Sequence, residues 1–203
     1  MNKYEKLQEL RVIPVVAINK IEDTIPLIGA LVKGGLPAAE ITYRTECASE
    51  AIKLAIETFP NAYIGAGTVI NATQAEEAIN LGCKFIVSPG LSKEVAEVCK
   101  KHDIVYLPGV VTPTEIMEAI SLGIEVVKFF PASNYGGLST IKALSGPFNK
   151  LRFMPTGGIN EDNILEYLSF NKIIACGGSW MCKGTPEEIC EKTKAAVNLV
   201  KGK

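Results

Sequence analysis

Short runs of apolar residues, many of them β-branched, recur along the chain and are separated by polar and charged stretches. Successive runs begin about 23 residues apart, which suits one strand followed by one helix. Both faces of each run are apolar. This is typical of parallel strands covered by helices, whereas a half-exposed antiparallel sheet would alternate with polar residues. The predicted strands open near Ile13, Pro37, Asn61, Lys84, Ile104, Glu125, Leu151 and Lys172.

Three stretches between these runs carry helix signals. The stretch "NATQAEEAINLG" begins with candidate caps and ends at Gly82, and "TPTEIMEAISLG" places Pro113 directly after Thr112 and ends at Gly123. The stretch "INEDNILEYL" begins with Asn160. Polar caps and an early proline start helices, and a terminal glycine stops them. We therefore expect a helix in each stretch.

Eight strand-and-helix units predict an α/β fold, a (β/α)8 TIM barrel formed as a single domain by residues 1–203. Such a barrel needs about 200 residues, so no room is expected for a second domain. An open, doubly wound sheet is the alternative, and it is disfavoured because no GxGxxG motif follows the first strand. We expect the first ten residues to form a short helix that packs on the barrel through Tyr4, Leu7 and Leu10.

Composition and charge narrow the classes of partner. With 47% hydrophobic residues and a formal net charge of −1, the chain is expected to be a soluble globular protein. No basic block interleaved with aromatic residues is present, so neither nucleic acid nor a membrane is an expected partner. The charged first ten residues do not resemble a secretory signal, and the six cysteines form no CxxC pair. Reduced thiols and a cytoplasmic location are expected.

A lysine interrupts the apolar run "GIEVVKFFPASN". Because strand side chains alternate, Lys128 shares a face with Val126 and Phe130, and we expect this face to point into the barrel. The same alternation puts Glu40 and Arg44 on one side of the second strand, provided that the chain stays extended as far as Arg44. A carboxylate and a guanidinium are thus predicted near the lysine.

A buried lysine has two interpretations. It can form an ion pair with Glu40 that only fills the barrel, although buried ion pairs are poor stabilisers. It can instead act as a nucleophile toward a carbonyl carbon and form a Schiff base. An ordinary lysine amine is protonated at neutral pH, so this use requires desolvation that favours the neutral amine. The apolar neighbours of Lys128 favour the second interpretation.

Glycine pairs follow the seventh and eighth predicted strands, in "TGG" and "GGS". Their backbone N–H groups are unobstructed, and these are the two loops where barrels often hold phosphate. Together they favour a phosphorylated ligand. Arg152 is expected at the opposite end of its strand and Arg44 beside Lys128, so the phosphate site is predicted to consist of neutral donors.

The chain contains a single histidine, His102. One histidine cannot supply the several ligands that the zinc site of a metal-dependent aldolase needs. We therefore expect no metal site, and His102 is interpreted as a surface residue near a helix end.

The stretches "EITYRTECA", "GAGTV", "SPGL", "KFFPA", "RFMPTGGI" and "GGSW", in this order, resemble the 2-keto-3-deoxy-6-phosphogluconate (KDPG) aldolase family, whose members often also cleave 4-hydroxy-2-oxoglutarate (KHG). The resemblance runs from about Val12 to Trp180. It implies a class I aldolase on a (β/α)8 barrel that forms a Schiff base with pyruvate, uses no cofactor and is usually a homotrimer. Tyr43 departs from the family, which commonly has leucine there, and its parity predicts outward packing.

The resemblance also implies roles for the residues that carry it. Lys128 would be the Schiff-base lysine and Glu40 the acid/base that moves protons. Arg44 and Thr68 would bind the pyruvate carboxylate, and Phe130 would form a wall of the lysine pocket. The distal half of the substrate would be bound by Thr156, Gly157, Gly158, Gly178 and Ser179, the first contacting its hydroxyl-bearing part and the others its phosphate.

Two other function classes stay open. A non-covalent sugar-phosphate isomerase or decarboxylase could use Glu40 and Lys128 as acid and base. A catalytically silent sugar-phosphate binding protein would need neither residue. In each case the expected partner is a small molecule, and reduction with borohydride in the presence of pyruvate separates these classes from an aldolase.

Overall fold

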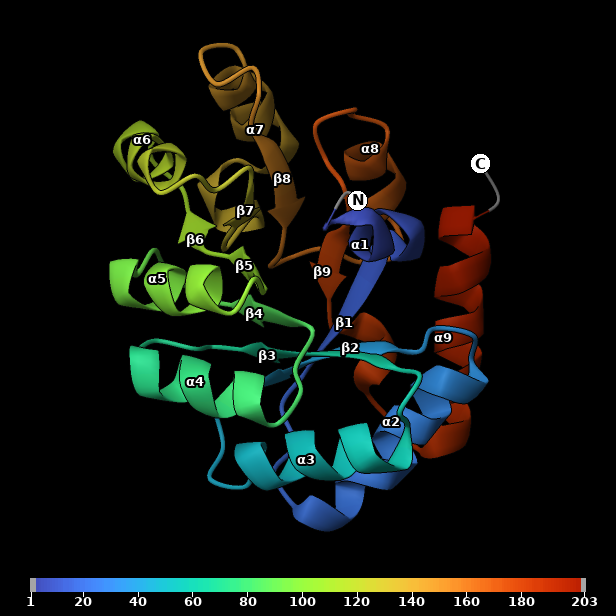
Figure 1. Cartoon of the computed structure of the whole chain (residues 1–203). Helices are drawn as coiled ribbons and strands as arrows, with labels where there is room; N and C mark the ends of the chain where they lie inside the picture. The colour runs from blue at the N-terminus through green and yellow to red at the C-terminus, as the bar shows by residue number, and fades with distance from the viewer. Residues whose placement is uncertain (1–2, 202–203) are drawn as a thin grey trace.

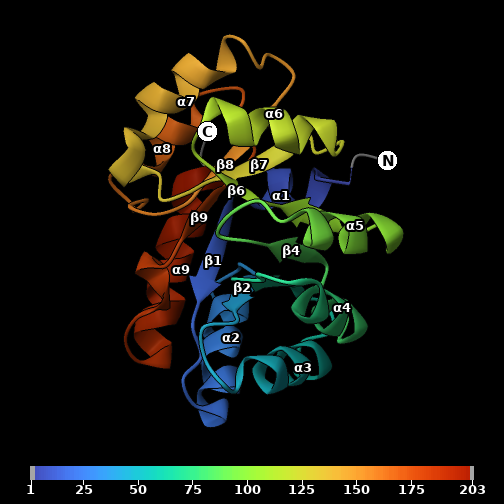
Figure 2. The same ribbon diagram turned by 90° about the vertical axis from the view of Figure 1, so that its left-hand side faces the viewer.

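In the computed structural model, which describes residues 3–201, parallel strands curl around a common interior and helices lie outside them (Figures 1 and 2). Residues 1, 2, 202 and 203 of the expected domain lie outside the described residues. Within the described part of the chain, no helix is both long enough and apolar enough to cross a membrane.

The strands are β1 (Val12–Val16), β2 (Ala38–Thr42), β3 (Tyr63–Gly67), β4 (Phe85–Val87), β5 (Val105–Leu107), β6 (Gly109–Val110), β7 (Val126–Phe129), β8 (Arg152–Pro155) and β9 (Cys176–Gly178). The α-helices are α1 (Glu5–Leu10), α2 (Thr24–Lys33), α3 (Ala48–Thr58), α4 (Ala72–Asn80), α5 (Lys93–Lys101), α6 (Pro113–Ser121), α7 (Gly137–Ser145), α8 (Ile164–Leu168) and α9 (Pro186–Lys201). Short 3-10 helices are η1 (Ile21–Asp23), η2 (Ser133–Tyr135) and η3 (Trp180–Cys182).

The strands form two parallel sheets, with the orders β5-β4-β3-β2-β1-β9 and β6-β7-β8. The order follows the chain from β1 to β5, and β1 also pairs with β9, the last strand. A doubly wound sheet instead reverses its order at a switch point, so this alternative is wrong. The strands are short and almost entirely buried, as expected from runs that are apolar on both faces.

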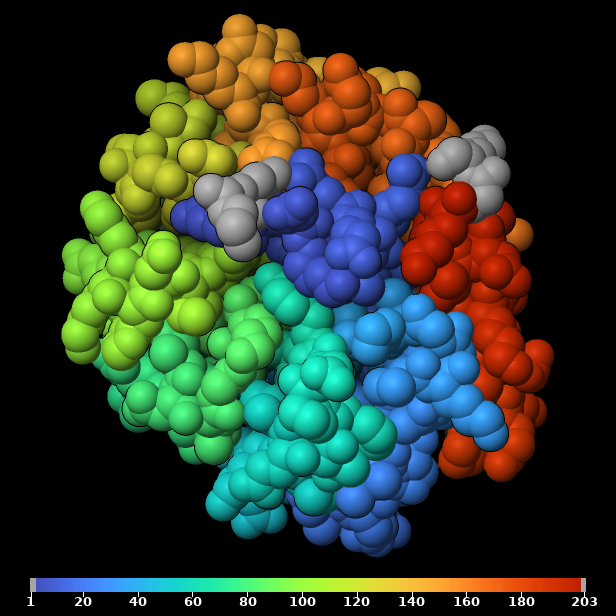
Figure 3. Space-filling view, turned by 45° about the vertical axis from the view of Figure 1, so that its right-hand side comes forward, coloured from blue at the N-terminus to red at the C-terminus, as the bar shows by residue number. Residues whose placement is uncertain are grey.

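Helix α1 lies at the end of the sheets where the strands begin. Tyr4, Leu7 and Leu10 are buried, as the sequence predicts. The guanidinium of Arg152, the first residue of β8, lies 5.2 Å from the centre of the Tyr4 ring. In Figure 3, α1 lies centrally and the later segments surround it in chain order. The carboxyl ends of the strands therefore lie away from α1, where the candidate site is found.

Two of the three helix predictions are confirmed at their first residues. Helix α4 begins after Asn71, whose side chain accepts a hydrogen bond from the N–H of Gln74. Helix α6 begins after Thr112, and Thr112 and Glu115 cap each other reciprocally. Each cap satisfies backbone N–H groups that a helix start leaves unpaired.

Other boundaries differ from the prediction. The helix expected from Asn160 begins only at Ile164, because the Asn160 side chain accepts a hydrogen bond from the N–H of Asp162 and supports a turn there. The last strand, expected from Lys172, begins at Cys176. Ile173 forms only an isolated bridge, so a single ladder contact precedes the strand itself.

Candidate active site

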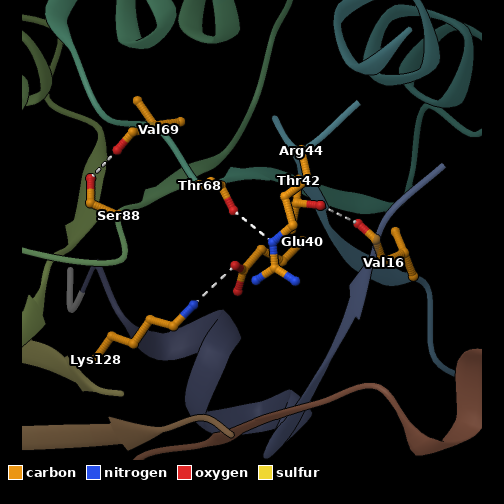
Figure 4. A network of polar contacts seen from close by, with 8 residues as sticks. All are labelled: Val16, Glu40, Thr42, Arg44, Thr68, Val69, Ser88 and Lys128. Atoms are coloured by element: carbon orange, nitrogen blue, oxygen red, sulfur yellow. Dashed lines mark hydrogen bonds and ion pairs between the residues drawn. The ribbon is translucent and has the colours of Figure 1, made fainter. Parts of the chain in front are cut away.

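Lys128 and Glu40 meet in the interior of the protein. Lys128 lies on β7 and Glu40 on β2, and the Lys128 Nζ is 3.2 Å from the Glu40 Oε1. Figure 4 shows the two side chains pointing toward each other. Their exposed fractions are 3% and 0%, so the ion pair is almost completely removed from water. Strand alternation thus predicted the inward direction of both side chains correctly.

The position of Glu40 depends on a glycine in the neighbouring strand. A Cβ atom at Gly67 would lie 2.4 Å from the Glu40 Oε1, closer than real Cβ contacts come. The absent side chain leaves space for the carboxylate. Within the described part of the chain, the second oxygen of Glu40, Oε2, is buried and has no hydrogen-bond partner. Buried carboxylate oxygens usually have partners, so the unpaired Oε2 is an exception in this interior.

Arg44 reaches the site by a turn. The predicted side of Arg44 depended on an extended chain as far as Arg44, and this condition is not met because β2 ends at Thr42. The Arg44 Nε donates to the Thr68 Oγ1 at 3.2 Å (Figure 4). The neighbouring Tyr43 packs outward as predicted: its hydroxyl donates to the Glu77 Oε2 at 3.2 Å. The hydrogen bond to Thr68 holds the Arg44 guanidinium near Glu40, as Figure 4 shows.

A cavity of about 480 Å³ opens beside the ion pair. The predicted site residues that line it are Arg44, Phe130, Thr156, Gly157, Gly158, Gly178 and Ser179. Lys128, Glu40 and Thr68 are not in its wall. Lys128 adjoins it through Phe130, since the Lys128 Nζ lies 5.0 Å from the centre of that ring. The hydroxyl of Thr156 is buried and has no partner in residues 3–201.

The close-packed glycines of the cavity wall have identifiable neighbours. Gly158 has a φ of +77°, and a Cβ there would lie 2.1 Å from the Ser133 Oγ. A Cβ at Gly178 would lie 2.0 Å from the Trp180 ring. These backbones pass too close to their neighbours for a side chain, so both positions require glycine.

Among the cavity-wall residues that sequence reasoning missed, Cys182 and Lys183 carry ionisable side chains. Burial raises the pKa of Cys182 to about 12, so this thiol stays protonated at neutral pH and is no nucleophile. Lys183 is exposed and lies after η3, in a stretch that carries no family motif. Lys183 adds a cation to the cavity wall, while the prediction that neutral donors build the phosphate site stays a prediction.

The charges around the cavity favour a ligand with two anionic groups. In the part of the wall that the structure describes, Arg44 and Lys183 are the cations and no carboxylate is present. A ligand with a carboxylate and a second anion could contact both cations. Opposite charges of this kind increase both affinity and the rate of encounter.

The residues 3–201 contain no group of three or more His, Cys, Asp and Glu side chains that could hold a metal ion. His102 follows the last residue of α5, and its Nε2 lies 2.8 Å from the Glu76 Oε2. It takes no part in the site. The six cysteines are free thiols, as predicted.

The chain matches a family of known proteins over most of its length. The family described as "KDPG and KHG aldolase" matches residues 4–196. The 2-dehydro-3-deoxy-phosphogluconate aldolase of Haemophilus influenzae is 46% identical over 176 residues, which cover 87% of this chain and 83% of that protein.

Two solved structures are similar over nearly their whole length. The 2-keto-3-deoxy-6-phosphogluconate aldolase of Zymomonas mobilis ZM4, solved with 3-phosphoglycerate, is 39% identical with a TM-score of 0.92, covering 98% of this chain and 97% of that one. The KDPG aldolase of Legionella pneumophila, solved with pyruvate as a covalent carbinolamine, is 38% identical with a TM-score of 0.91, covering 96% and 98%.

The contact between Gly67 and Glu40 gives a stability prediction. We expect Gly67→Ala to lower the free energy of unfolding by about 1 to 3 kcal/mol, because the added methyl group displaces the carboxylate in a packed interior. Urea denaturation followed by circular dichroism measures the change. Gly146→Ala is the matched control, since a Cβ there meets its nearest neighbour at an ordinary 3.4 Å. Equal unfolding free energies for the two variants would contradict the placement of Glu40.

Proposed function

The chain belongs to the KDPG and KHG aldolase family, and we propose that it cleaves both substrates through a Schiff base on Lys128. It is an aldolase, a lyase of carbon–carbon bonds. The products are pyruvate and glyceraldehyde 3-phosphate from KDPG, and pyruvate and glyoxylate from KHG. One observation carries the assignment of residues: a buried lysine amine lies 3.2 Å from a buried carboxylate beside a cavity that contains Arg44.

The reaction begins when the Lys128 amine attacks C2 of the substrate. Glu40 is in contact with the ammonium and receives the proton that the amine must lose. The adduct is a carbinolamine; its hydroxyl takes the proton back from Glu40 and leaves as water, which gives an iminium and restores the Glu40 carboxylate. The covalent pyruvate carbinolamine in the Legionella pneumophila aldolase supports this step. Arg44 grips the carboxylate, with Thr68 orienting the guanidinium, and so places C2 against the amine.

Cleavage uses the iminium as an electron sink. Glu40 takes the proton of the C4 hydroxyl, the C3–C4 bond breaks, and its electron pair moves to C3 to form an enamine while the aldehyde leaves. Thr156, whose buried hydroxyl is otherwise unpaired, hydrogen-bonds the C4 oxygen. Protonation of C3 by Glu40 and hydrolysis of the iminium then release pyruvate and regenerate Lys128.

The distal phosphate of KDPG occupies the glycine-rich end of the cavity. Gly157, Gly158, Gly178 and Ser179 line the cavity there, and the N–H groups of Gly157 and Gly158 and the Ser179 hydroxyl would donate to the phosphate, with Lys183 adding a positive charge. The 3-phosphoglycerate bound by the Zymomonas mobilis aldolase supports a phosphorylated ligand.

The competing classes have no support. The relatives described above, at 38% to 46% identity, are aldolases, and a silent binding protein would have no need to retain Lys128 and Glu40.

We further propose that the two sheets join into one (β/α)8 barrel within a single domain, residues 1–203. Three observations support this closure. Strands β5 and β6 are consecutive and separated by Pro108, whose carbonyl accepts the N–H of Lys128. One isolated parallel bridge joins Phe153 of β8 to Ile173, which precedes β9. A second joins Thr156, directly after β8, to Gly177 of β9. We also propose that the protein is a homotrimer and that it lies in the cytoplasm. Light scattering tests the oligomeric state.

The Schiff base predicts one covalent adduct. Borohydride reduction in the presence of pyruvate should add one pyruvate to the chain, on Lys128, and Lys128→Ala should abolish both the adduct and KDPG cleavage. Intact-mass and peptide mass spectrometry locate the adduct. An adduct on another lysine would overturn the assignment. No adduct in an active enzyme would favour the non-covalent class.

The role of Glu40 predicts a kinetic effect larger than its effect on folding. Glu40→Gln keeps the shape of the side chain and removes its basicity, so turnover should fall by about 10² to 10⁴ while the protein stays folded. Steady-state kinetics and circular dichroism measure the two quantities. Near-normal turnover with a shifted pH profile would show that Glu40 only neutralises Lys128.

The phosphate site predicts a difference between substrates. Ser179→Ala and Lys183→Gln should each raise KM for KDPG about 5- to 30-fold, the equivalent of about 1 to 2 kcal/mol for one hydrogen bond to a charged group. KM for KHG, which has no phosphate, should change little. Gly158→Val, in contrast, should impair both substrates, because its side chain would clash with Ser133 and strain the loop. Equal losses on both substrates for Ser179→Ala and Lys183→Gln would show that the phosphate lies elsewhere.

A further inference from the structure

A buried chain of hydrogen bonds lies next to the residues that position Arg44. The Tyr106 hydroxyl donates to the Ser88 Oγ at 3.0 Å, and the Ser88 hydroxyl donates to the Val69 carbonyl at 2.5 Å. The three residues come from β5, from the segment after β4 and from the segment after β3. Ser88 and Tyr106 are 2% and 5% exposed, so water does not substitute for these bonds. Figure 4 shows the Ser88–Val69 bond beside Thr68.

The donor and the acceptor of each hydrogen bond between Tyr106, Ser88 and Val69 can be assigned. The Tyr106 oxygen also accepts a hydrogen bond from the N–H of Ser92 at 3.2 Å, so its own proton is left for Ser88. Burial raises the pKa of Tyr106, which keeps the hydroxyl protonated and able to donate. Because a serine hydroxyl has one proton, accepting from Tyr106 leaves that proton to point at Val69. The direction of each bond is therefore determined.

Thr68 lies between two anchored peptide groups and has an unfavourable backbone conformation. Its φ is +57°, the left-handed region that costs a residue with a Cβ roughly 1 to 2 kcal/mol. On one side, the Gly67 carbonyl accepts the N–H of Tyr43 at 2.8 Å. On the other side, the Val69 N–H donates to the Val87 carbonyl at 3.1 Å, and the Val69 carbonyl accepts the Ser88 hydroxyl. The surrounding bonds thus hold a conformation that Thr68 would not adopt alone.

We propose that Ser88 and Tyr106 are positioning residues for pyruvate binding: they hold Val69, and through it Thr68, so that Thr68 presents its hydroxyl to Arg44. The inference rests on the proposed role of Arg44 as the carboxylate ligand. Neither residue lines the cavity, so their effect on the substrate is indirect. If the Ser88 hydroxyl is removed, the buried Val69 carbonyl loses a partner and Thr68 can relax, which frees the Arg44 guanidinium from its acceptor.

The test measures pyruvate binding apart from turnover. Borohydride trapping is recorded as a function of pyruvate concentration for the wild type, Ser88→Ala and Tyr106→Phe. The half-saturating concentration should rise about three- to tenfold in Ser88→Ala, the equivalent of one hydrogen bond lost, and less in Tyr106→Phe, where Ser88 can still donate to Val69. The adduct formed at saturating pyruvate should stay the same. KM for KDPG should rise in parallel, with kcat nearly unchanged, because a carboxylate contact acts on bound substrate and transition state alike.

Two controls separate positioning from a general loss of stability. Ser145→Ala also removes a buried hydroxyl that donates to a backbone carbonyl, that of Ile141 at 2.7 Å, but in α7. It should lower the melting temperature and leave half-saturation unchanged. In a Thr68→Val background the acceptor of Arg44 is already absent, so adding Ser88→Ala should have no further effect on half-saturation.

The outcomes distinguish this inference from the proposed function. If the wild type forms no adduct on Lys128, the proposed function fails. If the wild type is trapped but Ser88→Ala keeps the wild-type half-saturation, or if its effect persists in Thr68→Val, the positioning role is overturned. Should Ser88→Ala not fold, Tyr106→Phe keeps the aromatic ring in the core, and a wild-type half-saturation in that variant overturns the role equally.

Discussion

The burial of a lysine against a glutamate is the constraint on which the site depends. Taking two charges out of water costs several kcal/mol for each ion, and their attraction recovers this only with good geometry. The structure supplies that geometry from β2 and β7, and Gly67 on β3 leaves the space for the carboxylate. An oxygen of Glu40 is nevertheless left without a partner. A pair evolved for stability alone would satisfy that oxygen, so the incomplete bonding supports the chemical role proposed for Glu40.

Further hydrogen bonds between hydroxyl side chains and backbone carbonyls lie where the strands end, near Lys128 and Glu40. The hydroxyl of Thr42 donates to the Val16 carbonyl at 3.0 Å and ties the ends of β1 and β2 together. Ser88 and Tyr106 do the same for the segments after β3, β4 and β5. Parallel strands leave their last carbonyl groups without ladder partners, and buried groups of this kind need other donors. The hydroxyl side chains provide those donors and fix the turns from which Arg44 and Thr68 project.

Side-chain directions that follow the two-residue repeat of a strand could be predicted from the sequence. The positions of residues in loops could not. Alternation with period two placed Lys128 and Glu40 inward, because it depends only on each strand. The turn that brings in Arg44 breaks this period, so its position was predicted for the wrong reason. Lys183 lies in a loop without a motif, and only the folded chain shows that it borders the cavity. Likewise, 18 residues separate Ser88 from Tyr106, and the register of β4 with β5 brings them together.

The division between strands and loops also explains how one site can act on two substrates. The groups that make and break bonds, Lys128 and Glu40, lie on strands whose hydrogen-bonded register holds them rigidly. KDPG and KHG share the keto acid half that these groups and Arg44 would contact, and they differ only beyond C4. The residues that would meet this variable end, Gly158, Ser179 and Lys183, follow strands β8 and β9 in irregular segments. Substitutions there can alter substrate preference without moving the reacting atoms, because no strand register passes through them.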